Sequence, residues 1–158
     1  MRRFRFGLAA LLIALIAALS APMIIWHFKP SHILRVAILD KTVPDSAYRE
    51  HKGLTWLLDY FKYVKEDGQA YSAKDDYYGY VPGKDGSHTV RELGASGDDD
   101  LIYIADTYGV YKNDLTGSNI EGDRSDRIYG GLQMADVKQI KNAIYKGTSL
   151  IAEFNPLG

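Results

Sequence analysis

Ile33-Leu34-Arg35-Val36-Ala37-Ile38-Leu39-Asp40 is the stretch that decides the fold. It is a near-continuous apolar run in which Arg35 is the one charge before the terminal Asp40. Such runs are typical of a strand buried on both faces, as in a parallel sheet that helices cover on both sides. Leu101–Asp106 has the same form. The sequence therefore predicts two buried strands that each place an acid at the carboxyl end.

A helix is predicted directly after the first strand. Thr42-x-x-Asp45 has the form of a capping box, and Pro44 is tolerated in a first helical turn. Gly68 is the expected C-terminal cap. The inward stripe recurs at helical spacing and consists of Leu54, Leu57, Leu58, Phe61 and Val64.

A second helix and a third strand are predicted near the end of the chain. The helix covers Met134 to Lys146 and is capped by Gly147. The strand covers Ser149 to Phe154 and is again mostly apolar. The inward positions of this helix are expected to be Val137, Ile140 and Ile144.

The remaining segments have weaker patterns. A further strand is predicted at 69–72 or at 78–81, and a short helix at 89–93. Residues 107–131 are rich in turn-forming pairs and are predicted to be one long loop. Loops of this length in a compact domain are usually functional or mobile.

The alternation of strands and helices predicts an α/β domain with a parallel, doubly wound, flavodoxin-like sheet over residues 31–158. No helix follows the last strand to cover the sheet. We therefore expect the domain to be incomplete at its C-terminus, as in an N-terminal fragment. An unusually short version of the fold is the alternative.

Residues 1–30 are predicted to be a transmembrane anchor and a linker. The run from Phe6 to Phe28 has 23 residues without charge, and about 20 suffice to cross the hydrocarbon core as a helix. Arginines at positions 2, 3 and 5 favour a cytoplasmic N-terminus, which predicts a single-pass protein of the cell membrane with an extracytoplasmic domain. A signal peptide cleaved near Ala18-Leu19-Ser20 is the alternative, but the apolar run continues through Trp26.

Composition excludes several function classes. The net charge of −1 gives no general attraction to nucleic acid. The absence of cysteine excludes disulfides, thiolate metal sites and a cysteine nucleophile. The histidines show no metal-ligand spacing, and His51 is expected on the polar side of the first helix. No metal site and no cofactor is predicted.

The two strand-end acids are the weak candidates for a site. If the two strands are neighbours, about 4.8 Å apart, Asp40 and Asp106 share the switch point where such sheets bind ligands. Two carboxylates so close would form an acid–base pair or hold a cation. The alternative is that each carboxylate only accepts backbone N–H bonds from its own loop. Other polar groups expected at this edge, as ligand-binding candidates, are Lys41, Tyr108, Glu153 and Asn155.

Several segments together resemble a group of uncharacterised, membrane-anchored bacterial proteins. They are Val36–Pro44, Tyr48–His51, Asp76–Gly79, Leu101–Tyr108 and Ile128–Leu132. The outer portion of that group is similar to the class I glutamine amidotransferase-like fold. The resemblance implies a fold and a location rather than a reaction.

Catalysis in the broader superfamily depends on a cysteine at a tight strand-to-helix turn, and this chain has none. Amidotransferase activity is therefore not expected. The expected function is a non-catalytic binding or structural role in the cell envelope. Its expected partners are the lipid bilayer, through residues 6–28, and an envelope protein or a glycan. The many tyrosines could form an aromatic wall for such a ligand, but half-buried packing in the loops is the favoured interpretation. The alternative is a hydrolase or transferase that uses Asp40 and Asp106.

Overall fold

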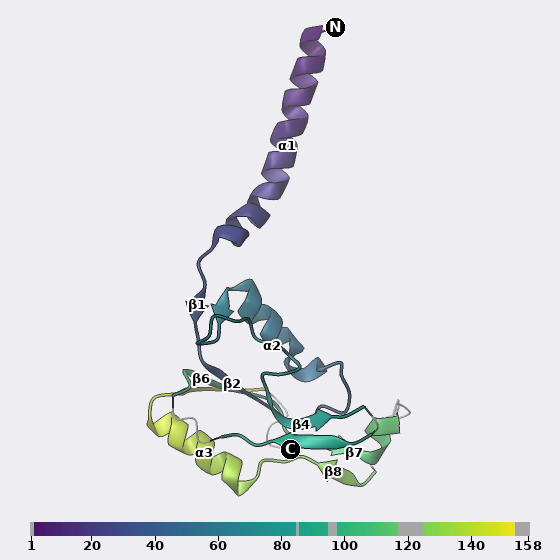
Figure 1. Ribbon diagram of the computed structural model, residues 1–158, viewed down its shortest axis with the longest axis vertical. Coiled ribbons are helices and arrows are strands. Elements are labelled where there is room, and N and C mark those ends of the chain that lie inside the picture. Colours follow the sequence, from purple (N-terminus) through teal and green to yellow (C-terminus); the bar gives the residue numbers. More distant parts are fainter. Residues whose placement is uncertain (1, 85, 95–97, 117–124, 154–158) are drawn as a thin grey trace. The chain divides into compact units, whose positions relative to one another are not determined.

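The computed structural model describes residues 2–84, 86–94, 98–116 and 125–153 (Figure 1). The chain divides into two units, Met1–Ser31 and His32–Gly158. Each is described by itself below.

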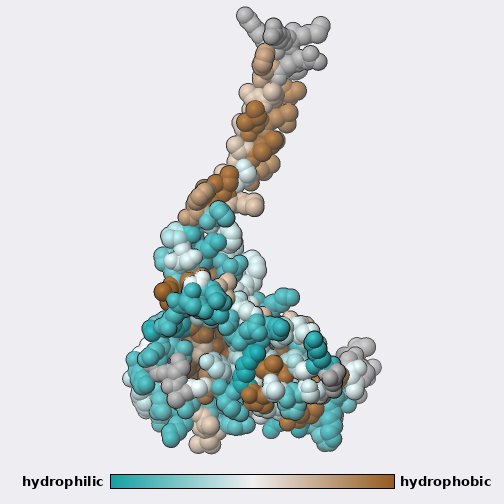
Figure 2. Space-filling model, in the orientation of Figure 1, coloured by the Kyte–Doolittle hydropathy of each residue, from teal (hydrophilic) through white to brown (hydrophobic). Residues whose placement is uncertain are grey.

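The first unit is one long helix, α1, from Arg2 to Phe28. Its Phe6–Phe28 portion is long and apolar enough, by length and composition, to cross a membrane. Figure 2 shows an apolar surface over most of this helix. The Ser20 hydroxyl donates to the Ile16 carbonyl at 2.8 Å, so this polar group is satisfied within the helix. The predicted apolar helix is confirmed.

The second unit is built on a five-stranded sheet in the order β5-β4-β2-β6-β9. Its strands are β2 (Val36–Asp40), β4 (Tyr78–Pro82), β5 (His88–Arg91), β6 (Leu101–Asp106) and β9 (Ser149–Ala152). β5 runs antiparallel to β4, and every other pairing is parallel. The predicted α/β domain is confirmed, with β2 as its central strand, but its sheet is mostly parallel rather than parallel throughout, because β5 is antiparallel.

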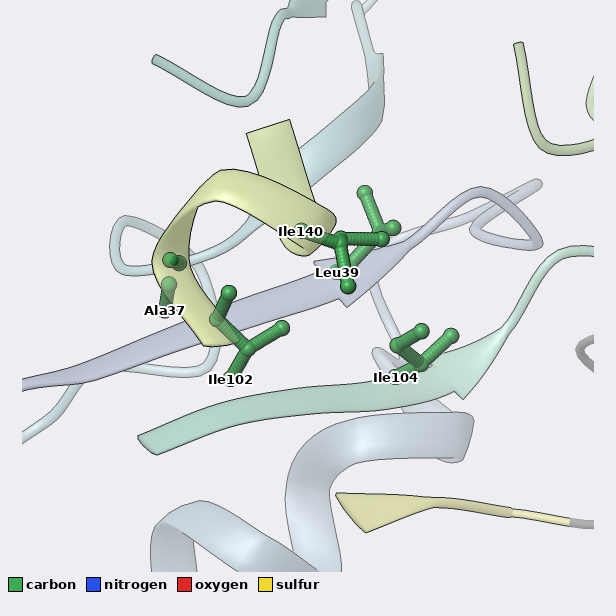
Figure 3. Close-up of a cluster of buried hydrophobic side chains, with 6 residues drawn as sticks. Ala37, Leu39, Ile102, Ile104 and Ile140 are labelled. Atoms are coloured by element: carbon green, nitrogen blue, oxygen red, sulfur yellow. The ribbon is translucent and has the colours of Figure 1, made fainter. Parts of the chain in front are cut away.

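Two helices, α2 (Arg49–Tyr60) and α3 (Met134–Tyr145), cover opposite faces of this sheet (Figure 1). Side chains alternate along a strand, so each helix packs on every second residue of β2. Ala37 and Leu39 pack with Ile140 of α3, together with Ile102, Ile104 and Ala143 (Figure 3). Val36 and Ile38 pack with Leu58 of α2, together with Val43 and Tyr77.

The first helix begins and ends at other residues than the sequence predicts. α2 begins at Arg49, because Thr42 is used in contacts with β6 and Tyr48 has a left-handed φ of 50°. It ends at Tyr60, because Lys62 is also left-handed, with φ 64°. Its buried residues are His51, Thr55 and Leu58, whereas the predicted inward residues Leu57 and Phe61 are exposed.

Val64 and Ile33 belong to short strands rather than to the helix and the central strand. β3 (Tyr63–Val64) pairs in parallel with β1 (His32–Ile33) in a separate two-stranded sheet. The predicted strand of residues 33–39 is therefore interrupted at Arg35. That side chain forms a two-pronged ion pair with Asp100, at 2.8 and 3.1 Å.

Three other predictions are corrected or refined. A strand forms at 78–82 rather than at 69–72, and residues 89–93 lie largely in strand β5 instead of a helix. The long segment 107–131 contains β7 (Val110–Tyr111), the short 3-10 helix η1 (Lys112–Thr116) and β8 (Arg127–Tyr129), and β7 pairs with β8.

The second helix is confirmed, but its buried face differs from the predicted one. Ile140 faces inward, whereas Val137 and Ile144 are exposed. The other buried residues of the helix are Asp136 and Ala143. β9 lies at the edge of the sheet and is exposed along its length, and Phe154, its predicted end, lies outside the described residues.

Candidate functional site

The carboxyl ends of β2 and β6 lie side by side, as the sequence predicts. The register aligns Val36 with Leu101 and, after an irregularity between Leu39 and Asp40, aligns Asp40 with Asp106. The Lys41 N–H donates to the Asp106 carbonyl at 2.8 Å, so the pairing continues past the end of β2. The two acids therefore share one edge of the sheet.

Thr42 connects the two carboxylates. Its N–H donates to Asp40 Oδ1 and its hydroxyl donates to Asp106 Oδ1, both at 2.9 Å. The same hydroxyl accepts from the Gly109 N–H at 2.9 Å. The Tyr108 N–H donates to Asp106 Oδ1 at 2.6 Å. Each acid thus accepts a backbone N–H from two residues ahead, the local contact that a purely structural role requires.

His51 is fully buried and lies against Asp40. Its Nδ1 is 2.5 Å from Asp40 Oδ2, and its Nε2 is 2.7 Å from the Ala73 carbonyl oxygen. Its ring stacks on Tyr77, with the centroids 4.6 Å apart. The prediction that His51 lies on the polar side of the helix is wrong. The sequence did carry the signal, because His51 precedes Leu54 and Leu58 by three and seven residues, on one helix face.

The contacts of His51 determine where its ring carries a proton. A carbonyl oxygen only accepts hydrogen bonds, so Nε2 is the protonated nitrogen that donates to Ala73. Nδ1 then either donates to the Asp40 carboxylate or accepts from the protonated Asp40 carboxyl. In both cases one proton is held between Asp40 and His51, and Nε2 has no lone pair with which to accept another.

Lys41 lies on the other face of the sheet from Asp40, as alternation along a strand requires. Its buried amine pairs with the buried carboxylate of Asp136 at the start of α3. Asp136 also accepts the Gln133 N–H at 2.8 Å as part of a capping box. The amine is 5.5 Å from the centroid of the Tyr129 ring. Lys41 therefore fastens α3 to the sheet, and its amine is not exposed at the edge.

The environment of the Tyr129 hydroxyl raises its pKa. Burial first, and then the charges of Glu92 and Asp136, raise the pKa of Tyr129 to about 12. The hydroxyl is therefore neutral at physiological pH.

Of the other predicted site residues, Tyr108 and Glu153 are exposed. Glu153 contacts the Tyr103 hydroxyl. The Glu153 N–H donates to the Ile104 carbonyl at 3.0 Å, so this residue follows β9 at the carboxyl end of the sheet. Burial first, and then the charges of Glu50 and Asp40, raise the pKa of Glu153. Asn155 lies outside the described residues.

No metal centre is formed by the part of the chain that the structure describes. Within it, no three or more histidine, aspartate or glutamate side chains are arranged to hold an ion.

A hollow of about 580 Å³ lies at the opposite, amino-terminal end of β2. Arg35 borders it, and the hydrogen bond and charge of that guanidinium hold the pKa of Asp100 at about 2. Many of the other charges here are also paired, as Lys65 is with Asp76 at 3.1 Å. The hollow is lined by Arg35, Val36, Lys65, Glu66, Asp67, Tyr71, Asp75, Asp76, Tyr77, Tyr78, Arg91, Asp98 and Asp99.

Comparison with known proteins returned no match to a family model, to a curated protein or to a solved structure.

Proposed function

We propose that this chain is a membrane-anchored protein whose α/β domain lies outside the cytoplasm and has a non-catalytic binding or structural role in the cell envelope. The observation that carries the non-catalytic part is the engagement of the Asp40–His51 pair. Both Asp40 oxygens and both His51 ring nitrogens have hydrogen-bond partners within the domain, and both side chains are fully buried.

A catalytic aspartate–histidine pair needs a different arrangement. The carboxylate orients one ring nitrogen, and the other nitrogen stays free to take a proton from a nucleophile or a water. Here that second nitrogen, Nε2, is hydrogen-bonded to the Ala73 carbonyl oxygen. The pair is therefore suited to holding the 73–77 segment and α2 against β2.

The finer description of the fold belongs to the same proposal. The parallel strands lie in the order second, first, third and fourth along the chain, which is the order of flavodoxin-like, doubly wound sheets. Helices on opposite faces of the sheet support the same description. We extend the proposal to a likeness with the amidotransferase-like fold, without amidotransferase activity, because the chain has no cysteine.

The alternative, a hydrolase or transferase that uses Asp40 and Asp106, requires substrate to reach these carboxylates. Asp40 has no exposed surface, and Asp106 is bonded to Thr42 and Tyr108. Chemistry at this edge would therefore need Thr42 and His51 to move first. We favour the non-catalytic role for that reason.

A single engineered cysteine tests the proposed topology, since the chain has none of its own. Lys138 is exposed on α3, so we expect Lys138→Cys to react with a membrane-impermeant maleimide in intact cells expressing the full chain. A cysteine in an N-terminal extension, as the matched control, should react only after lysis. Labelling of Lys138→Cys only after lysis would contradict an outward domain, and loss of residues 1–28 by mass would contradict a retained anchor.

A further inference from the structure

The outward face of α2 carries a group of exposed aromatic residues near the end of the helix. Trp56, Tyr60 and Phe61 are 62%, 50% and 46% exposed. The Trp56 and Tyr60 rings stack with centroids 5.3 Å apart, and Tyr60 meets Phe61 edge-on at 5.2 Å. We call these three residues the aromatic face.

Trp56 and Tyr60 lie away from the buried side of α2. α2 is buried through His51, Thr55 and Leu58. With 3.6 residues per turn, Trp56 and Tyr60 lie on the opposite side of the helix. Contiguous exposed aromatic surface of this kind marks a contact with a partner or a membrane.

Chain connectivity indicates which of these two contacts applies. Only Lys29, Pro30 and Ser31 separate the end of α1 from β1. The His32 N–H donates to the Lys62 carbonyl at 2.8 Å, one residue beyond Phe61. His32 can be at most about 15 Å from Phe28 along the chain. The end of α2 is therefore tied to the residue at which the chain enters the domain.

The residue types fit the same location. Tryptophan and tyrosine are enriched where hydrocarbon meets water, because each ring has an apolar body and a polar tip. The headgroup region on each side of a bilayer is about 5–8 Å thick, which is comparable to the reach of the three-residue linker. A protein partner could also bind aromatic residues. We favour the bilayer because only three residues connect the proposed anchor to β1, which is hydrogen-bonded beside the end of α2.

We propose that the aromatic face lies in the headgroup region of the membrane that α1 spans and fixes the orientation of the domain on that membrane. The inference rests on the proposed membrane anchorage. It adds a second contact with the same bilayer, made by the folded domain.

Tryptophan fluorescence tests this proposal, because the chain has two tryptophans, Trp26 and Trp56. The full chain would be reconstituted in phosphatidylcholine vesicles as Trp26→Phe, which leaves Trp56 as the reporter. Quenching by lipids brominated on the upper acyl chain would be compared with quenching by aqueous iodide. We expect brominated lipid to quench Trp56 strongly and iodide to quench it weakly.

The matched control places a tryptophan on the other helix. Tyr145, on α3, is 77% exposed, and α3 covers the opposite face of the sheet from α2. In the Trp26→Phe, Trp56→Phe background, Tyr145→Trp should show the reverse pattern, with lipid quenching several-fold weaker than at Trp56. Equal lipid quenching at the two positions would overturn the proposal. Protection of Trp56 from both quenchers, with cross-linking to a second copy, would also overturn it in favour of a protein interface.

A further variant separates failure of the docking from failure of the anchor. Trp56→Phe retains Trp26, which lies in α1. If brominated lipid quenches Trp26 but not Trp56, the anchor is retained and the docking proposal fails. If neither is quenched and the protein does not float with the vesicles, the proposed anchorage fails and the docking proposal fails with it.

Discussion

Replacing Asp40 with alanine is expected to destabilise the domain by about 3–5 kcal/mol, because it removes one partner of a fully buried pair. His51 would keep its bond to Ala73 but would have no group opposite Nδ1. The Thr42 N–H would also lose its acceptor. Urea unfolding of the full chain in detergent, followed by fluorescence, measures the change.

Two further variants test whether the loss of stability in Asp40→Ala comes from its buried hydrogen bonds. Asp40→Asn keeps an oxygen for the Thr42 N–H and offers an N–H to His51 Nδ1, so we expect a loss of only about 1 kcal/mol. Asp45→Ala removes a similar local bond, to the Ala47 N–H at 2.7 Å, but at an exposed site. It should change stability little. Near wild-type stability of Asp40→Ala would contradict a structural role for this carboxylate.

Replacing Lys41 with alanine is expected to have an effect of similar size. It would leave the Asp136 carboxylate buried with the Gln133 N–H but without its counter-charge. Breaking one side of a buried ion pair costs about 3–5 kcal/mol. The same unfolding experiment measures this loss, and we expect α3 to become less protected from amide hydrogen exchange.

A double variant distinguishes loss of the charge pair from loss of packing. Lys41→Met with Asp136→Asn removes both charges, preserves most of the volume and leaves an oxygen for the Gln133 N–H. It should recover most of the stability that Lys41→Ala loses. Lys112→Ala, which breaks the exposed pair with Asp126, is the control and should have no measurable effect. A double variant as unstable as Lys41→Ala would contradict the charge-pair explanation.

The strands that carry the candidate site were predictable because their signal is local. The predicted strand Leu101–Asp106 has the same first and last residues as β6. The buried part of the first predicted strand is β2, Val36–Asp40. A short apolar run bounded by turn residues indicates a buried strand without reference to the rest of the chain. Asp40 and Asp106 were expected to share one edge only if their strands were neighbours, and the register shows that the two strands are paired there.

The features that were missed depend on contacts between distant residues. Thr42 was predicted to cap a helix, but its hydroxyl bonds to Asp106, 64 residues away. β1 and β3 have two residues each, too few to show a period. His51 was placed on the polar side because of its polarity, although its spacing matches the buried face. Its partners, Asp40 and Ala73, lie 11 and 22 residues away and cannot be identified from the helix alone.

The central claim is that the Asp40–His51 pair is part of the fold and is not available for chemistry. The most direct test is the nitrogen-15 NMR signal of the His51 ring in the full chain at neutral pH, assigned with a His51→Gln variant. The structure predicts that Nε2 carries a proton and is hydrogen-bonded, because it donates to the Ala73 carbonyl. An unprotonated Nε2, free to act as a base, would contradict this account.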